Sequence, residues 1–131
     1  MIGLDTNVLV RYLAQDAPAQ AALATKLIES LTAEVPGFIS HVVLVETVWV
    51  LESCYAVDSA QIAQVVEMLL HVDSLMVDEA DVVWRALRQC KQVGGDFADA
   101  LVTTLAQRAG CDTVYSFDRG AAKRSGMTLL R

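Results

Sequence analysis

The stretch that decides the fold is the first thirteen residues, Met1-Ile-Gly-Leu-Asp-Thr-Asn-Val-Leu-Val-Arg-Tyr-Leu13. A short apolar run stops at Asp5, Thr6 and Asn7, and an apolar stretch with helical spacing follows. This pattern predicts a strand, a tight polar turn and a helix capped by Thr6 or Asn7. In open α/β sheets, ligands bind at the carboxyl ends of the strands. Asp5 is therefore the first candidate for chemistry, and capping of the next helix is the alternative role.

The remaining chain repeats this alternation of short apolar runs and helical patterns. Further strands are expected at residues 37–39, 75–77 and 113–117, with an edge strand at 127–130. Helices are expected after Asp16 with an apolar stripe of Leu23, Leu27 and Leu31, and then at about 41–55, at 59–70 with Ser59 as its cap, and at 78–91 and 96–109. Such alternation is typical of α/β proteins. We expect one domain, residues 1–131, folded as a three-layer α/β/α sandwich around a mainly parallel sheet of four to five strands.

Composition excludes several classes of protein. The 131 residues are 54% apolar and 20% charged, which is typical of a well-packed globular domain. No apolar run approaches the ~18 residues of a membrane span. The N-terminus lacks the basic region of a signal peptide, so we expect a cytoplasmic protein. Three cysteines and two histidines show no metal-ligand spacing, which argues against a zinc site and a Ser-His-Asp triad.

The net charge of −6 conceals an asymmetry along the chain. Residues 1–84 carry 2 basic and 12 acidic side chains, whereas residues 85–131 carry 8 basic and 4 acidic ones. A net negative charge does not predict nucleic-acid binding, but a local basic face would still allow it.

Four acidic residues share an unusual placement. Asp5 and Asp118 end expected strands, Glu46 lies early in the helix after the second strand, and Asp99 lies in the first turn of its helix. Right-handed crossovers would bring these positions to one edge of the sheet. Two carboxylates ~4 Å apart repel by about 4 kcal/mol at an effective dielectric near 20. Oxygen ligands favour Mg²⁺ or Mn²⁺, ions that activate water and polarise phosphoryl groups, so the cluster indicates phosphodiester hydrolysis.

Each acid also has a structural alternative. Glu46 could be a buried acid paired with an arginine. Asp96 and Asp99 form the D-x-x-D pattern of a helix N-cap and its N3 position. For Asp96 the capping role is at least as plausible as catalysis. Asp118 could be an exposed turn residue.

Four motifs together resemble the PIN-domain family, and within it the VapC toxins of bacterial toxin–antitoxin pairs. The motifs are Met1-Ile-Gly-Leu-Asp-Thr-Asn-Val-Leu, Ser40-x5-Glu46-Thr-Val-Trp-Val-Leu, Asp96-Phe-Ala-Asp99-Ala-Leu-Val and Val114-Tyr-Ser-Phe-Asp118-Arg. The resemblance implies an α/β/α fold, a Mg²⁺- or Mn²⁺-dependent endoribonuclease, a homodimer and a cognate VapB-like antitoxin. It transfers the catalytic and metal-binding roles to Asp5, Glu46, Asp99 and Asp118. Asp96 and Ser116 become accessory residues, and Asn7 is expected to orient Asp5.

The expected mechanism combines the placement of the four acids with the resemblance to the PIN-domain family. Asp5 and Asp99 hold the metal most directly, while Glu46 and Asp118 bind a second ion or order the attacking water. Displacement of the 3′ oxygen would leave a 5′-phosphate and a 3′-hydroxyl. Arg119, Lys123 and Arg124 either steer the RNA backbone or form a solvated helix face.

The apolar residues of the helices indicate partners, and Asn7 argues against one rival function. The helices within 18–32 and 41–70 carry more apolar residues than a small sheet needs, which suggests a homodimer seam and a groove for an antitoxin helix. The residues expected there are Trp49, Leu51 and Tyr55 on one side and Leu23 and Leu27 on the other, with an ordinary core as the alternative. A small phosphatase would need an aspartate where Asn7 stands. An inactive PIN-like binding module or a housekeeping nuclease remains an alternative.

Overall fold

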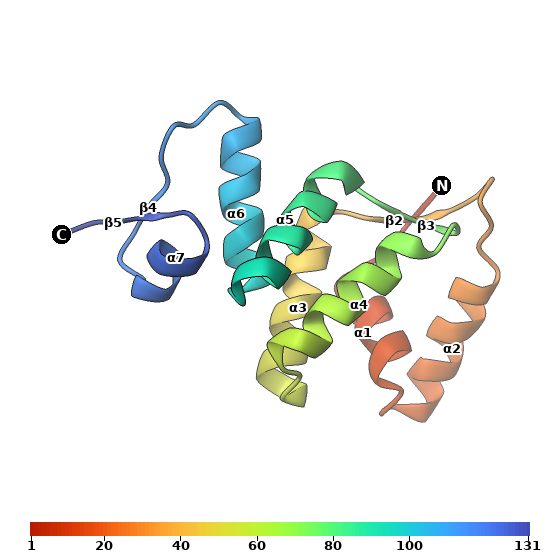
Figure 1. Cartoon of the computed structure of the whole chain (residues 1–131). Coiled ribbons are helices and arrows are strands. Elements are labelled where there is room, and N and C mark those ends of the chain that lie inside the picture. Colours follow the sequence, from red (N-terminus) through yellow and green to blue (C-terminus); the bar gives the residue numbers. More distant parts are fainter. The chain divides into compact units, whose positions relative to one another are not determined.

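The computed structural model describes residues 1–131 and divides into two compact units. Unit 1 comprises residues 1–57 and 68–78, and unit 2 comprises residues 58–67 and 79–131. Figure 1 labels the elements, which are β1 (Ile2–Gly3), α1 (Thr6–Ala14), α2 (Pro18–Glu29), β2 (Gly37–Ile39), α3 (His41–Tyr55), α4 (Ser59–His71), β3 (Leu75–Val77), α5 (Ala80–Val93), α6 (Phe97–Arg108), β4 (Tyr115–Ser116), α7 (Arg119–Arg124) and β5 (Thr128–Leu129).

Unit 1 is built on a parallel three-stranded sheet in the order β1-β2-β3. Its central strand begins at Gly37, which pairs with Ile2 on one side and Leu75 on the other. A Cβ atom at Gly37 would lie 2.8 Å from Leu31 Cδ1 and 2.9 Å from Leu4 Cδ1. The absence of a side chain at Gly37 therefore lets these leucines close over the sheet.

The helices of unit 1 pack on one another beside this sheet. Helix α1 contacts both α2 and α3, and Figure 1 shows α1 and α2 side by side. Leu9, Ile39 and Leu44 are fully buried and form the centre of this core.

The expected apolar stripe is wrong on α2 itself, whereas Leu31, which follows the helix, is buried as expected. The buried residues of α2 are Ala21, Ala24 and Ile28, whereas Leu23 is 69% exposed. Small alanines allow close helix packing, and they turn Leu23 and Leu27 to the flank of the helix. This register places two leucines beside a cavity rather than in the core.

Unit 2 contains a helical pair and a small parallel sheet. Helix α5 packs against α6, with Val82, Leu87 and Leu101 buried. Strands β4 and β5 form a two-stranded parallel sheet, with α7 as the connection between them. Helix α5 begins at Ala80 instead of Asp78, because Glu79 adopts a left-handed conformation with φ of 43°.

The five strands are parallel, as expected, but they form two sheets instead of one. Each strand is only two or three residues long and offers few backbone groups for pairing. Strand β4 covers Tyr115 and Ser116 alone and takes β5 as its hydrogen-bonding partner. The α/β class is therefore confirmed, whereas the single sheet of four to five strands is wrong.

Two expected helix caps are also corrected. Asp5, not Thr6 or Asn7, is the N-cap of α1. At the start of α4, the Asp58 carboxylate accepts from Gln61 N, and the Gln61 side chain accepts from Asp58 N. This reciprocal capping box takes the place of the expected Ser59 cap. None of the helices combines the length and the apolar character needed to cross a membrane.

Candidate functional site

The first acidic group lies in unit 1, where Asp5 follows the first strand. Asp5 Oδ1 accepts a hydrogen bond of 2.8 Å from Thr6 N, and Asp5 O accepts from Leu9 N. The two roles proposed for Asp5 are therefore compatible. One carboxylate oxygen takes part in the cap, while the other is left to bind a ligand.

Thr6 connects Asp5 to Glu46 and was not identified from the sequence. Its backbone N–H binds Asp5, and its hydroxyl donates to Glu46 Oε1. Thr6 is 7% exposed, whereas both carboxylates are exposed. The alternative of a buried Glu46 paired with an arginine is wrong, since Thr6 is its partner. The available signal was a hydroxyl residue directly after the first acid.

These residues share one cavity of about 530 Å³ in unit 1. Its wall includes two carboxylates and one basic side chain, that of Arg11. The lining residues are Asp5, Thr6, Asn7, Val10, Arg11, Glu46, Val50, Cys54 and Tyr55. Asn7 is exposed on this wall, and the hydrogen bond to the Asp5 carboxylate comes from Thr6.

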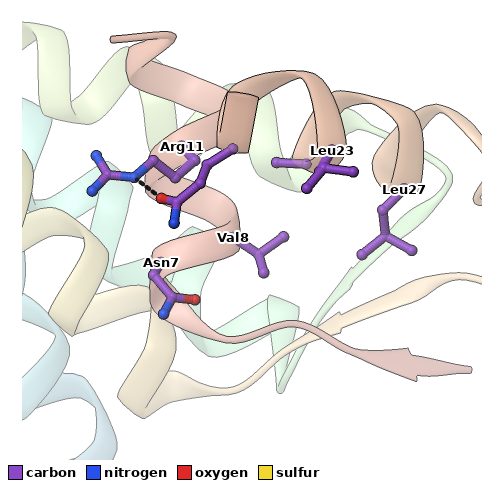
Figure 2. Close-up of a pocket in the computed structure, with 7 residues that line it drawn as sticks. Asn7, Val8, Arg11, Leu23 and Leu27 are labelled. Carbon is purple, nitrogen blue, oxygen red and sulfur yellow. Dashed lines mark hydrogen bonds between the residues drawn. The ribbon is translucent and has the colours of Figure 1, made fainter. Parts of the chain in front are cut away.

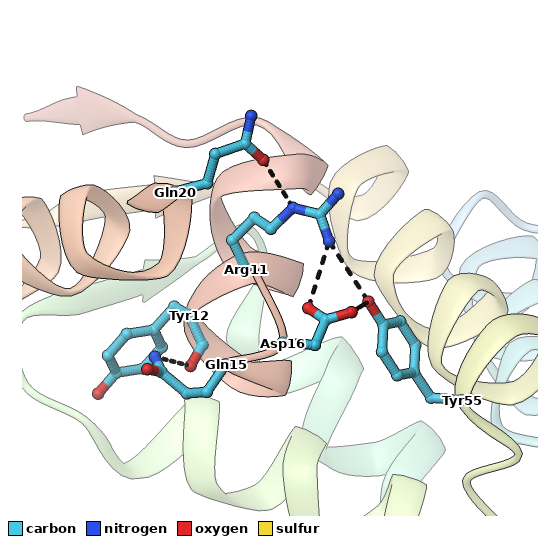
Figure 3. A network of polar contacts seen from close by, with 6 residues as sticks. All are labelled: Arg11, Tyr12, Gln15, Asp16, Gln20 and Tyr55. Carbon is cyan, nitrogen blue, oxygen red and sulfur yellow. Dashed lines mark hydrogen bonds and ion pairs between the residues drawn. The ribbon is translucent and has the colours of Figure 1, made fainter. Parts of the chain in front are cut away.

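Arg11 is held in this wall by a polar network (Figure 3). Its Nε donates to Gln20 Oε1 at 2.8 Å, and its Nη1 donates to Asp16 Oδ1 at 3.3 Å and to Tyr55 Oη at 3.4 Å. Tyr55 Oη in turn donates to Asp16 Oδ2 at 2.7 Å. The tyrosine hydrogen bond, aided by the Arg11 charge, lowers the pKa of Asp16, and the same bond raises the pKa of Tyr55.

The second acidic group lies in unit 2, where two acids cap helices. Asp96 is the N-cap of α6, and its Oδ1 accepts from Asp99 N at 3.0 Å, so the expected capping role is confirmed. Asp118 is the N-cap of α7, and its Oδ1 accepts from Ala121 N at 3.1 Å. Ser116 Oγ accepts from Asp118 N at 2.9 Å and fixes the turn before α7.

Asp99 is the titratable group most affected by this arrangement. Partial burial raises the pKa of its carboxyl, and the negative charges of Asp96 and Asp118 raise it further. This happens although Asp99 lies in the first turn of α6, where the helix dipole favours a negative charge. A cation near Asp99 would relieve the repulsion between these carboxylates.

The donor chemistry of both groups suits a hard divalent ion. Carboxylate oxygens are the ligands that Mg²⁺ and Mn²⁺ prefer. No set of three or more His, Cys, Asp or Glu side chains is arranged to hold a metal ion. Asp96 and Asp118 each use one carboxylate oxygen as a helix cap, which limits their freedom to converge. Asp5 and Glu46 belong to unit 1, and Asp96, Asp99 and Asp118 belong to unit 2.

The basic residues expected to steer RNA lie on α7. Arg119 and Lys123 line a cavity of about 640 Å³ in unit 2, together with Phe117 and Arg131. Arg124 is exposed, and its carbonyl oxygen accepts from the Gln89 side chain.

A separate apolar cavity of about 270 Å³ lies between α1 and α2 (Figure 2). Val8 on α1 faces Leu23 and Leu27 on α2, and Arg11 closes one end with its bond to Gln20. Of the residues expected on a partner surface, Leu23 and Trp49 are 69% and 62% exposed. Leu51 is 4% exposed and belongs to the core, so its assignment to that surface is wrong.

Comparison with known proteins identifies one family. The family model described as PIN domain matches residues 2–126, which is nearly the whole chain. A search of curated proteins finds no match.

Proposed function

The chain belongs to the PIN domain family, whose members are generally metal-dependent nucleases, and we infer from this that it is a Mg²⁺- or Mn²⁺-dependent endoribonuclease. The observation that carries the proposal is the Thr6 bridge, which holds Asp5 and Glu46 at one cavity of unit 1. The raised pKa of Asp99 supports it, because clustered carboxylates are favourable only when a cation neutralises them.

The proposed site residues are Asp5, Glu46, Asp99 and Asp118, which bind the metal and the attacking water. A bound divalent ion would lower the pKa of water and polarise the phosphoryl group. Asp5 and Asp99 are the principal ligands in this proposal. Ser116 positions Asp118 through the turn, and Asp96 keeps Asp99 at the start of α6. Hydrolysis would leave a 5′-phosphate and a 3′-hydroxyl.

Cleavage of a labelled single-stranded RNA tests the activity. The wild type should cut in Mg²⁺ or Mn²⁺ and stop in a chelator, while Asp5→Asn and Asp99→Asn should lose the activity and remain folded. Lys26→Gln removes a charge from the exposed face of α2 and serves as the control. Unchanged cleavage by folded Asp5→Asn would disprove the site assignment.

Calorimetry with Mn²⁺ separates the enzyme from an inactive PIN-like binding module. The wild type should bind the ion, and Asp5→Asn and Glu46→Gln should weaken binding. A chain that binds RNA but neither Mn²⁺ nor Mg²⁺ would be a binding module.

We further propose that this ribonuclease is the cytoplasmic toxin of a toxin–antitoxin pair. The apolar cavity between α1 and α2, with Val8, Leu23 and Leu27 in its wall, suits the apolar face of an antitoxin helix. Expression in a bacterial host should arrest growth for the wild type and not for Asp5→Asn. Equal growth of both strains would favour a housekeeping nuclease.

A homodimer is part of the same proposal. Trp49 is a large apolar side chain that is 62% exposed on α3, and we assign it to the dimer contact because aromatic residues are enriched in protein interfaces. Light scattering should give twice the mass of the 14.2 kDa chain, and Trp49→Ser should reduce it. A monomeric wild type at micromolar concentration would rule out the dimer.

A further inference from the structure

The function proposed above assigns no role to Arg11, yet Arg11 lines the same cavity as Asp5 and Glu46. It is the only Lys, Arg or His side chain that lines this cavity, which Asp5 and Glu46 make negative. An RNA strand carries a negative charge at every phosphate, so those carboxylates repel the parts of the substrate that no cation neutralises. A guanidinium in this wall is the protein group best suited to hold a phosphate, because it is permanently charged and carries N–H donors on several nitrogens.

The network around Arg11 fixes its orientation. Gln20, Asp16 and Tyr55 accept hydrogen bonds from its Nε and Nη1 atoms, so Nη2 is the terminal nitrogen that takes no part in this network (Figure 3). The Tyr55–Asp16 hydrogen bond of 2.7 Å braces this arrangement. A preorganised side chain loses less conformational entropy when it binds.

The spacing along α1 indicates which phosphate Arg11 would hold. Asn7 and Arg11 are four residues apart on α1, so they lie on one face of the helix. With a rise of 1.5 Å per residue, Arg11 is about 6 Å further from Asp5 than Asn7 is. Arg11 therefore lies further along α1 than the position of the reacting phosphate beside Asp5 and Glu46.

We propose that Arg11 binds the RNA phosphate next to the one that is cleaved, and that Asp16 and Tyr55 are positioning residues for its guanidinium. The proposal rests on the ribonuclease function proposed above. The competing explanation is that the network only ties α1, the α1–α2 turn and the end of α3 together, with Asp16 neutralising Arg11. The two explanations differ in the salt dependence of RNA binding.

The test compares Arg11→Gln with Lys26→Gln, which removes the same charge from α2 away from this cavity. Cleavage in Mn²⁺ gives kcat and KM, and fluorescence anisotropy of a labelled single-stranded RNA in chelator gives the affinity at several salt concentrations. Arg11→Gln should raise KM about tenfold with little change in kcat, as expected for a group that binds substrate and transition state alike. It should also reduce the slope of log affinity against log salt by about 0.7, the value for one phosphate contact in a single strand.

Two further variants keep the test decisive if Arg11→Gln folds poorly. Arg11→Lys keeps the charge and should keep the salt slope, while KM rises because lysine cannot make the hydrogen bonds to Gln20, Asp16 and Tyr55 that orient the guanidinium. Tyr55→Phe removes the brace and should raise KM by a smaller factor with the slope unchanged.

Arg11→Gln and Lys26→Gln with equal KM and equal slope, or an Arg11→Gln variant that loses only thermal stability, would overturn the role of Arg11. A wild type that neither cleaves nor binds RNA would instead overturn the proposed function.

Discussion

At the scale of single residues, Thr6 is the group that links Asp5 to Glu46 in unit 1. It holds Asp5 through its backbone and Glu46 through its hydroxyl. Thr6→Val keeps the shape and the backbone bond but removes the donor to Glu46. We expect Mn²⁺ affinity to fall about 10- to 100-fold, the usual effect of losing a group that orients a metal ligand. Titration calorimetry measures it.

Thr6→Ser is the matched control for this prediction, since it retains the hydroxyl and should bind Mn²⁺ like the wild type. Equal affinities for Thr6→Val and Thr6→Ser would show that the hydroxyl does not orient Glu46.

Asp99 gives a prediction about stability and pH. Its pKa is raised by burial and by Asp96 and Asp118, so the folded chain holds this proton more tightly than the unfolded chain does. The resulting stabilisation is present at low pH and is lost as the pH rises through the pKa of Asp99 in the folded state. Metal-free Asp99→Asn should therefore melt at a higher temperature than the wild type near pH 7, and the difference should vanish below about pH 4.

Thermal melts in chelator across this pH range check the prediction. Asp73→Asn, in the exposed turn before β3, controls for the general loss of a negative charge. A wild type that is more stable than Asp99→Asn at neutral pH would contradict the argument.

The sequence singled out the acids as candidates but did not indicate the residues that hydrogen-bond to them. Asp5, Glu46, Asp99 and Asp118 stand out because each follows a strand or begins a helix amid apolar neighbours. The partner of Thr6 is 40 residues away, and the partners of Arg11 include Tyr55, 44 residues away. Side-chain contacts over such separations leave no local pattern, so only the structure shows them.

At the scale of elements, α7 depends on Asp118. The helix has only six residues, which is too short to be stable by itself, and the Asp118 carboxylate satisfies Ala121 N at its start. Asp118→Asn retains the capping oxygen, so it should lose cleavage while keeping stability. Asp118→Ala loses both, and the missing cap should cost about 1 kcal/mol of unfolding free energy.

Urea unfolding and RNA cleavage, measured on both variants, separate the capping role of Asp118 from its proposed role as a metal ligand. Equal destabilisation by Asp118→Asn and Asp118→Ala would argue that the carboxylate charge, and not the capping hydrogen bond, stabilises α7. Full activity of Asp118→Asn would remove Asp118 from the site.

Helices were easier to predict than strands or helix ends. The long apolar periodicities of α3, α4, α5 and α6 gave helices close to their observed ranges. The short helix α7 lacks that periodicity, and the sequence indicated it only through the alternative of a solvated helix face with Arg119, Lys123 and Arg124. Cap identity depends on which of several neighbouring polar side chains reaches an N–H group, as at Asp5 and Asp58. Burial on α2 depends on its packing partner, so the spacing of Leu23 and Leu27 alone did not show which face of the helix is buried.

At the scale of the whole molecule, the sequence predicted parallel strands but not their distribution between two sheets. Residue patterns indicate which segments are extended. The pairing of these segments depends on backbone hydrogen bonds, and each strand is only two or three residues long. Pairing of such short strands is decided by the packing of the helices around them, which a linear pattern does not encode.

The chain path nevertheless suggests that the two units fold together. Neither unit is a continuous segment, and α4 contributes residues 59–67 to unit 2 and residues 68–71 to unit 1. Helix formation is cooperative, so half of α4 is not expected to persist when the other half unfolds. We propose that residues 1–131 are one cooperative domain, consistent with a family match that spans both units.

Hydrogen exchange tests this cooperativity. Leu87 is 1% exposed in unit 2, and Leu87→Ala should cost 2–5 kcal/mol through lost burial and the cavity left behind. If the chain unfolds as one domain, the slowest amides around Leu9 and Leu44 in unit 1 should lose the same free energy as those of α5 and α6. Leu44→Ala, 0% exposed in unit 1, should destabilise unit 2 in the same way. Protection that falls only in the mutated unit would instead mean that each unit unfolds independently.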